Sequence, residues 1–144
     1  MYNNIMSNKK YRIYADMCAD LFHAGHVNFI KQCKNYKENV HLIIGIHSDE
    51  DIKSYKRIPI CTMDERIKVV ESCKYVDEVI SNSPLKITKD YVNKHKIDLV
   101  IHAGEIPEDE KNNWYSEILD IYREVPRTNG ISTTDIINRI KKRI

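Results

Sequence analysis

The sequence predicts an α/β fold in which a doubly wound parallel sheet carries helices on both faces. Short runs rich in β-branched residues alternate with longer segments whose apolar residues recur near the helical period. The strand-like runs are almost continuously apolar, which is typical of parallel strands buried on both faces. At 144 residues, without repeats or linker-like segments, the chain is expected to form a single domain over residues 1–144.

Five segments have the composition of buried strands. They are residues 11–15, 40–47, 76–80, 97–102 and 121–125. The second is rich in β-branched side chains, the fourth is apolar until its end, and the fifth is closed by Pro126. Alternation of these strands with helices predicts a five-stranded, Rossmann-like sheet, in which ligands bind beyond the carboxyl ends of the strands.

Helices are expected between the strands. They cover about 25–36, a segment that begins at 62, another that begins at 88, residues around 114–119, and a C-terminal segment from 132. Thr62 is followed by Glu65 at the spacing of a capping box, and Ser132 is followed by Asp135 in the same way. The charged stretch that runs from the second strand to Pro59 is expected to be rich in loops.

Composition excludes several broad classes. A formal charge of +2 is too small for a general nucleic-acid binder. The longest apolar run, residues 42–46, is far short of a membrane span, and residues 1–10 are polar, lack a signal-peptide core and are expected to form a flexible tail. The four cysteines form no Cys-x-x-Cys pair, which favours reduced thiols in a cytoplasmic protein and argues against a zinc site.

The first candidate site follows the first strand. His23 and His26 straddle the start of a helix, where free backbone N–H groups and the helix dipole favour an anion. Gly25 lets a ligand approach the backbone closely, and Asp20 could orient one imidazole. Taken alone, the segment fits a phosphate site and a pair of surface histidines equally well.

The second candidate site follows the last strand. Ser132, Thr133 and Thr134 offer hydroxyl groups and free amides at another helix N-terminus, and Arg127 stands nearby as a cationic fork. A plain N-terminal cap explains this segment alone more simply.

Together these segments resemble the cytidylyltransferase family. "HAGH" and "RTNGISTTDII" carry the resemblance, supported by "YADMCADLFHAGH", "HSDEDIKSYK" and "MDERIKVVESCKYVDEVI". The histidine motif is shared with other nucleotidyltransferases, including adenylyltransferases, whereas the C-terminal motif is more specific and points to CTP. The sequence departs from the family pattern at Met17, Ala19 and Gly104, and a catalytically degenerate nucleotide-binding protein is the alternative from a different class.

The resemblance implies transfer of CMP from CTP to a small phosphorylated alcohol, with release of pyrophosphate. It assigns catalysis to His23, His26, Lys56 and Arg127. It assigns nucleotide binding to Cys18, Ala19, Asp20, Gly25, Arg66, His102, Ile131, Ser132, Thr133 and Thr134. Mg²⁺ is expected on the CTP phosphates, without dedicated metal ligands from the protein.

The resemblance leaves the acceptor open. The candidate acceptor-binding residues are Asp20, Lys56, Leu85, His102, Glu105 and Glu108. Leu85 and Glu108 stand where choline-type members have aromatic residues, and two carboxylates, Glu105 and Glu108, suit a primary ammonium. Phosphoethanolamine or a similar compound is therefore favoured, with glycerol 3-phosphate and phosphocholine as alternatives.

The resemblance also bears on partners. The segment "KYVDEV" resembles the dimer-interface segment of the family, so a homodimer is expected. No nucleic-acid partner and no stable membrane association are expected, because the chain shows no long amphipathic membrane-binding helix.

Overall fold

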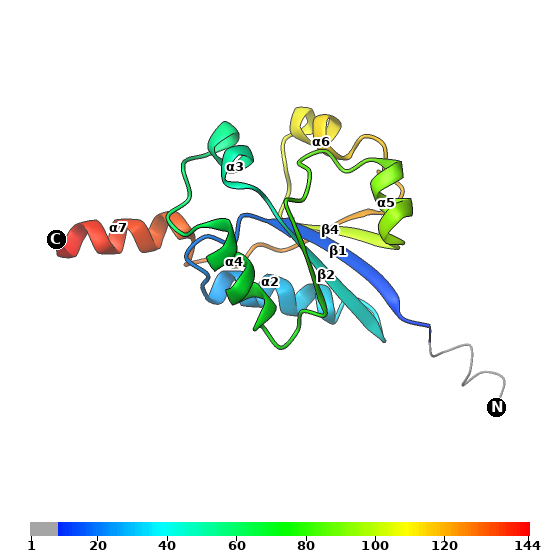
Figure 1. Ribbon diagram of the computed structural model, residues 1–144, viewed down its shortest axis with the longest axis horizontal. Coiled ribbons are helices and arrows are strands. Elements are labelled where there is room, and N and C mark those ends of the chain that lie inside the picture. Colours follow the sequence, from blue (N-terminus) through cyan, green and yellow to red (C-terminus); the bar gives the residue numbers. More distant parts are fainter. Residues whose placement is uncertain (1–8) are drawn as a thin grey trace.

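The computed structural model describes residues 9–144, which fold around a five-stranded parallel sheet of order β3-β2-β1-β4-β5 (Figure 1). The strands are β1 (Tyr11–Met17), β2 (Val40–Ile46), β3 (Glu78–Ser81), β4 (Leu99–Ala103) and β5 (Tyr122–Val125). Ile13 of β1 pairs with Leu42 on one side and Leu99 on the other. The predicted doubly wound sheet is confirmed, while most of the tail expected at 1–10 lies outside the described residues.

Helices alternate with the strands. They are α2 (Ala24–Lys34), α3 (Asp49–Tyr55), α4 (Met63–Glu71), α5 (Lys89–His95), α6 (Glu108–Tyr115) and α7 (Thr133–Arg143). Thr62 and Glu65 form the predicted capping box of α4. At α7 the structure shows the Ser132 half of the predicted box, in which the Ser132 hydroxyl accepts from the Asp135 amide at 3.0 Å.

One loop prediction and one helix prediction were wrong. The stretch expected to be rich in loops contains α3, because Ser48 caps its N-terminus and three acidic residues in its first turn suit the helix dipole. The helix expected around 114–119 instead begins earlier, at Glu108, and ends at Tyr115 as α6. Acidic side chains at 108–110 favour the earlier start.

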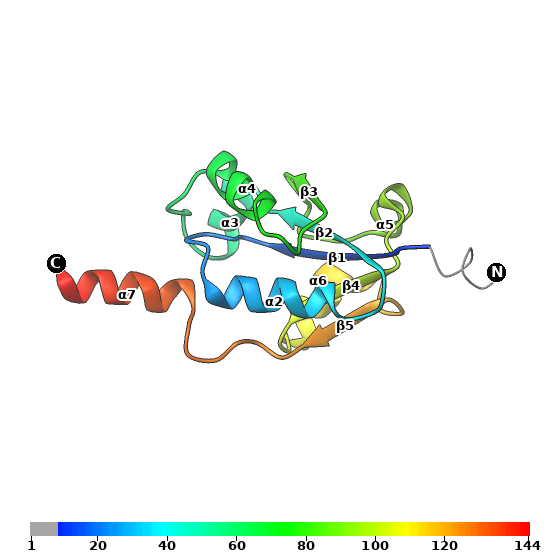
Figure 2. The same cartoon turned by 90° about the horizontal axis from the view of Figure 1, so that it is seen from below.

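The sheet separates two apolar layers (Figure 2). Alternation along β1 directs Ile13 and Ala15 into the layer that contains α2 and α4, and Tyr14 into the layer that contains Ile87 and Tyr115. Figure 2 shows α2 along one face of the sheet. Burial on both faces explains why the strand sequences lack a polar alternation.

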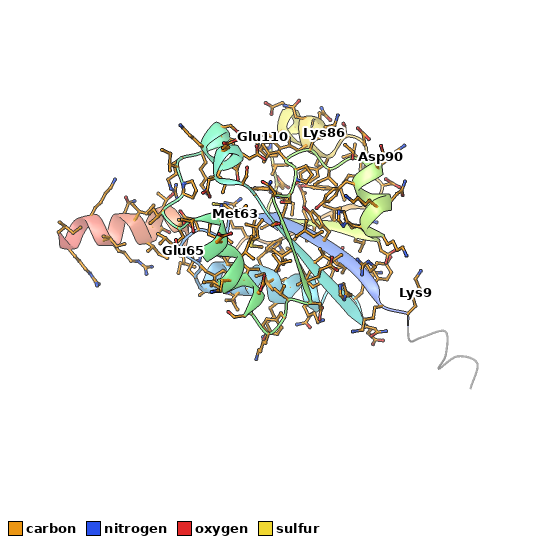
Figure 3. All side chains as sticks on the ribbon, viewed as in Figure 1. Lys9, Met63, Glu65, Lys86, Asp90 and Glu110 are labelled. Carbon is orange, nitrogen blue, oxygen red and sulfur yellow. The ribbon has the colours of Figure 1, made fainter. Side chains whose placement is uncertain are left out.

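The strand order reverses between β1 and β4, so both carboxyl ends open onto a topological switch point. The N-terminus of α7 lies near this point, and the rest of α7 extends away from the body, opposite the end of the molecule at which Lys9 lies (Figure 3). The four cysteines are unpaired. Within residues 9–144, no helix has both the length and the apolar character needed to cross a membrane.

Candidate active site

Two adjoining cavities lie at the switch point. The histidine cavity, of about 220 Å³, is lined by Asp16, Met17, His23, Gly25, His26, Phe29, Lys56, His102, Ala103, Arg127, Thr128, Ile131, Ser132 and Thr133. The aromatic cavity, of about 270 Å³, is lined by Asp16, Met17, Cys18, Ala19, His26, His47, Tyr55, Lys56, Leu85, His102, Trp114, Tyr115, Arg127 and Thr133. Half of each lining is shared, so the two cavities form one cleft.

The backbone of α2 holds both imidazoles of the histidine cavity. His23 is the N-cap of α2, and its Nδ1 accepts from the Gly25 amide at 3.0 Å. His26 Nδ1 accepts from the His23 amide at 3.1 Å. A nitrogen that accepts carries no proton, so each neutral ring has its proton on Nε2. The capping contacts therefore fix two Nε2–H donors within the cleft.

The environment keeps both rings neutral at physiological pH. Burial, with smaller effects of His23 and Lys56, lowers the pKa of His26 to about 4. Burial, followed by the nearby Lys56 ammonium, also lowers the pKa of His23. The histidines are thus hydrogen-bond donors, whereas Lys56 and Arg127 bring the positive charge of the cleft.

Gly25 leaves room for the first imidazole. A Cβ atom at this position would stand 2.8 Å from His23 Cε1 and 3.0 Å from His23 Nδ1, closer than van der Waals contact allows. The glycine is therefore required here by packing against the side chain of His23.

The C-terminal motif meets the N-terminal motif across the cleft. The Thr133 hydroxyl donates to the Asp20 carbonyl at 3.1 Å and lies 3.4 Å from His23 Nε2. Ser132 caps α7 beside them. The N-termini of α2 and α7 thus converge, and both present partial positive charge and free amides to the same space. Arg127, which donates to the Ala103 carbonyl at 3.4 Å, lines both cavities.

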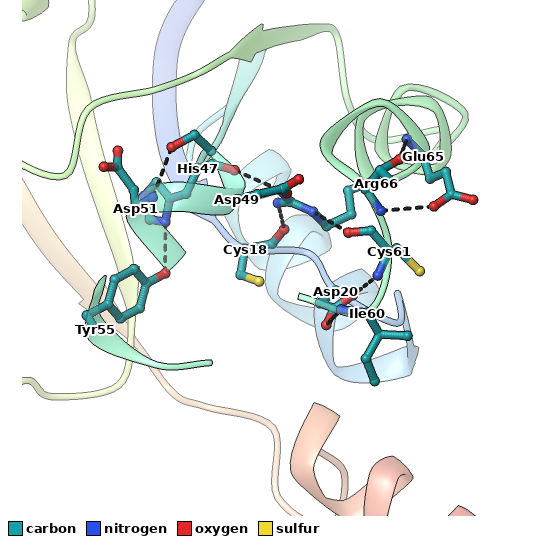
Figure 4. Close-up of polar contacts among 12 residues, drawn as sticks. Cys18, Asp20, His47, Asp49, Asp51, Tyr55, Ile60, Cys61, Glu65 and Arg66 are labelled. Atoms are coloured by element: carbon teal, nitrogen blue, oxygen red, sulfur yellow. Dashed lines mark hydrogen bonds and ion pairs between the residues drawn. The ribbon is translucent and has the colours of Figure 1, made fainter. Parts of the chain in front are cut away.

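Asp20 and Arg66 hold the loops around the cleft (Figure 4). The two oxygens of the buried Asp20 carboxylate accept from the amides of Ile60 and Cys61, each at 2.9 Å. These contacts anchor the segment that follows Lys56, and Asp20 does not orient an imidazole by hydrogen bonding as expected. Its side chain positions a loop.

Arg66 connects four parts of the chain. Its fully buried guanidinium donates to the carbonyls of Cys18 (2.6 Å), His47 (3.0 Å) and Cys61 (3.2 Å), and to Asp49 Oδ1 (2.6 Å). Cys18 follows β1 and His47 follows β2, whereas Cys61 precedes α4 and Asp49 is the first residue of α3 (Figure 4). The sequence indicated a nucleotide-pocket role, whereas the structure places Arg66 behind the cleft as a crosslink between its loops.

The aromatic cavity contains a poorly compensated carboxylate. Asp16, 7% exposed, is the one carboxylate in the described lining of the cleft. Its Oδ1 accepts from the Tyr115 hydroxyl over a long 3.4 Å, and its Oδ2 lies 3.3 Å from His47 Nε2 without an aligned hydrogen bond. A buried carboxylate with such weak partners favours a bound cation.

The predicted site residues do not include several residues of this cavity. They are Asp16, His47, Tyr55, Trp114 and Tyr115. A signal existed for Asp16 and His47, because both stand at the carboxyl ends of the neighbouring strands β1 and β2, and β1 flanks the switch point. The aromatic residues come from α3 and α6, the two helices that sequence patterns placed wrongly, and Tyr55 meets Trp114 edge to face.

Most of the remaining candidates lie in the cleft. Cys18, Ala19, Leu85 and His102 line the aromatic cavity, and Ile131 lines the histidine cavity. The described linings do not include Thr134, Glu105 or Glu108, all three of which are exposed. Asp16 is thus the carboxylate that lines the described cleft, whereas Glu105 and Glu108 were the predicted ones. Among residues 9–144, no group of three or more metal-ligating side chains could hold an ion.

Comparison with known proteins shows which family and which proteins this chain resembles. Residues 14–139 match the cytidylyltransferase-like family. A probable ethanolamine-phosphate cytidylyltransferase of Schizosaccharomyces pombe is 38% identical over 137 residues, which cover 93% of this chain and 37% of that protein. Choline-phosphate cytidylyltransferase A of Mus musculus is 41% identical over 133 residues, which cover 90% and 36%.

This chain therefore corresponds to little more than a third of each of those relatives. A solved structure, the lipopolysaccharide core biosynthesis protein of Thermoplasma volcanium, superposes with a TM-score of 0.67 over 84% of this chain and 100% of that one, at 20% identity, which supports the fold alone. The family match runs from β1 into α7, so it includes both helix N-termini that converge on the cleft. The chain belongs to the cytidylyltransferase-like family.

Proposed function

We propose that the protein transfers CMP from CTP to a phosphorylated amino alcohol and releases pyrophosphate. The observation that carries this proposal is the convergence of two helix N-termini, two fixed imidazole donors and two cationic side chains on one cleft. Such a site matches the triphosphate of a nucleotide, which bears about four negative charges. The named relatives support cytidine as the nucleoside.

The chemistry follows from the protonation states. The Nε2–H groups of His23 and His26 would donate to phosphate oxygens as negative charge redistributes during attack at the α-phosphorus. Lys56, which lines both cavities, would bridge the nucleotide and the acceptor phosphate, and Arg127 would hold the departing pyrophosphate. The attacking phosphate oxygen is already anionic, so the site needs no general base.

Mg²⁺ is part of this proposal as a companion of CTP. Asp16 is the only carboxylate that the described lining offers, so triphosphate oxygens and water would provide most of the coordination. When bound, the ion neutralises phosphate charge, while the orientation of the phosphates is the task of the two helix N-termini.

The aromatic cavity favours an acceptor that carries a cation. The side chain of Asp16 is largely buried and weakly partnered, and the aromatic residues Tyr55, Trp114 and Tyr115 line the same cavity. An ammonium group would compensate the carboxylate and lie against these rings. Glycerol 3-phosphate has no cation to offer, so phosphoethanolamine and phosphocholine suit the cavity better.

Pyrophosphate release tests the proposal. The protein is incubated with CTP, Mg²⁺ and either phosphoethanolamine, phosphocholine or glycerol 3-phosphate. We expect turnover with an amino-alcohol phosphate and at least a hundredfold loss in His23→Ala, with Asp135→Asn on the exposed face of α7 as a control. Turnover of glycerol 3-phosphate alone would refute the acceptor assignment. Binding of CTP without turnover of any acceptor would refute the enzyme assignment.

A homodimer also belongs to the proposal. Apolar side chains at Ile58, Ile60 and Val69 are exposed beside or on α4, next to the segment that resembles the family's interface. Sedimentation equilibrium would report twice the monomer mass if a second copy covers them, and a monomer at high micromolar concentration would contradict this part.

A further inference from the structure

His47 is the most unusual polar group of the aromatic cavity. The residue is 8% exposed and lines the cavity directly after β2. Its Nε2 atom is buried and forms no hydrogen bond with any described residue, even though Asp16 Oδ2 is only 3.3 Å away. Because a buried polar atom without a partner is costly, a ligand that completes its hydrogen bonding binds with an advantage.

The position of this nitrogen is fixed on three sides. The His47 amide donates to the Met17 carbonyl at 3.1 Å, and its carbonyl accepts from Arg66 at 3.0 Å. On the ring, Nδ1 is hydrogen bonded to the Tyr55 hydroxyl at 3.0 Å (Figure 4). When Nδ1 carries the ring proton and donates to Tyr55, Nε2 presents a lone pair to the cavity.

A donor placed between Asp16 and His47 would satisfy both. The carboxylate supplies the charge that an ammonium group needs, and the adjacent nitrogen supplies a second acceptor. A primary ammonium has three N–H donors, whereas a quaternary ammonium has none. Methyl groups against Nε2 would leave it buried without a partner.

We propose that His47 is the residue that selects the acceptor, because its Nε2 accepts a second N–H from an ammonium group held by Asp16. This inference rests on the proposed function and makes it narrower: phosphoethanolamine is preferred to phosphocholine because of hydrogen bonding, and the size of the head group is secondary. In this assignment the Tyr55 hydroxyl accepts from the Nδ1–H of His47, and Tyr55 is the positioning residue that keeps the lone pair of Nε2 aimed at the cavity.

A series of N-methylated phosphoethanolamines tests whether the cavity offers two hydrogen-bond acceptors, Asp16 and His47, to the ammonium group. The N-methyl compound retains two N–H donors, enough for both Asp16 and His47. The N,N-dimethyl compound retains one, which the charged Asp16 takes. In the wild type, kcat/KM is therefore expected to change less than threefold with the first methyl group and to fall at least tenfold with the second.

Variants of His47 connect this step to the proposed atom. We call the tenfold fall in kcat/KM between the N-methyl and the N,N-dimethyl compound the methylation step. In His47→Leu this step is expected to shrink below threefold, because activity with the primary and secondary ammonium compounds is lost, while KM for CTP is unchanged. His47→Gln, whose side-chain oxygen can accept, is expected to restore part of the step. His41→Leu is the matched control, because His41 lies on β2, the strand that leads to His47, but contacts Glu78 outside the cleft.

The outcomes separate this inference from the function itself. No pyrophosphate from wild type with any acceptor overturns the proposed function. A wild type without the step, a step that persists in His47→Leu, or an equal loss with phosphocholine overturns the role of His47. If His47→Leu does not fold, as judged by circular dichroism, Tyr55→Phe decides: a step of unchanged size in that variant overturns the inference, and a smaller step supports it.

Discussion

At the scale of single residues, the site depends on imidazoles that remain neutral. The capping contacts of His23 and His26 need unprotonated Nδ1 atoms, and burial disfavours the charged rings. Protonation of either ring would place a donor against a backbone N–H and would break the cap. The same contacts that start α2 therefore set the tautomer that the chemistry needs.

Acid should destabilise the fold through His26. Its pKa is lowered to about 4 in the folded state, so between pH 6.5 and 4 the unfolded chain binds more protons and stability rises with pH. From pH 7 to 5.5, this group alone is expected to remove about 1 kcal/mol of the free energy of unfolding. Urea unfolding at both values measures the loss, which should be smaller in His26→Gln. Equal losses in the two proteins would contradict the assigned pKa shift.

Gly25→Ala should act through His23. The new Cβ would lie 2.8 Å from the imidazole, which has to move because the helix backbone cannot. We expect kcat to fall by about a hundredfold, since displacement by about 1 Å can cost that much. A double-mutant cycle with His23→Ala provides the check. If Gly25→Ala reduced activity equally in the presence and absence of His23, the effect would have another cause.

At the scale of elements, loops between strands and helices form the cleft, and buried polar contacts hold those loops. Arg66 ties the start of α3 to the loops after β1 and β2, whereas Asp20 anchors residues 60 and 61. The positive φ angles of Ala19 (57°) and Leu21 (48°) show how tightly the chain turns between β1 and α2. Asp20, between them, provides the compensating contacts.

Arg66→Lys should be strongly destabilising. A lysine ammonium cannot reach four acceptors in different directions, so buried carbonyls would lose their donors. The expected loss in free energy of unfolding is about 2–4 kcal/mol. Arg12→Lys is the control, because Arg12 also donates to a backbone carbonyl but is 29% exposed, and its loss should stay within about 1 kcal/mol. Similar losses for both variants would contradict the crosslinking role.

Asp20→Asn should loosen the loop that follows Lys56. The amide group would place N–H donors against one of the two backbone amides that Asp20 now accepts from. Hydrogen exchange at Ile60 and Cys61 is expected to be at least tenfold faster, with a higher KM for CTP. Asp98→Asn, which affects a carboxylate bonded to the Arg12 amide away from the cleft, should leave exchange at both positions unchanged. An unaltered exchange rate in Asp20→Asn would show that the hydrogen bonds from the Ile60 and Cys61 amides to Asp20 are not needed to hold this loop.

At the scale of the whole molecule, the cleft joins an early and a late segment of the chain. Segments 16–26 and 127–133 are far apart in sequence, yet they share a cavity and a direct hydrogen bond between Thr133 and Asp20. A ligand bound there contacts both segments at once. The outer part of α7 extends beyond this junction (Figure 1), so its side chains take no part in the cleft.

CTP should therefore stabilise the entire fold. At a concentration of about 100 times Kd, a ligand specific for the native state adds about 2.7 kcal/mol, which corresponds to a rise in Tm of roughly 5–10 °C. Differential scanning fluorimetry would show this shift and its loss in Arg127→Ala. Arg139→Ala, on the exposed outer part of α7, is the matched control and should retain the shift. An undiminished shift in Arg127→Ala would remove Arg127 from the phosphate site.

The sequence by itself determined the sheet, because continuous apolar runs such as 42–46, in alternation with helical patterns, indicate strands within a sheet covered on both faces. It also indicated the two motifs that are proposed to hold phosphate, since helix N-termini are recognisable from local capping residues such as Ser132. These signals depend on near neighbours in the chain. Local patterns therefore sufficed for them.

Only the tertiary structure decided which side chains face the ligand. Glu105 and Glu108 carry the charge that an ammonium requires but are exposed, whereas Asp16 and His47 meet because β1 and β2 are adjacent and in register. Arginine is a residue type that commonly binds phosphate, yet hydrogen bonds to acceptors on several separate loops hold Arg66 in the interior. Burial and orientation are properties of contacts between distant segments, and no local pattern in the sequence encodes them.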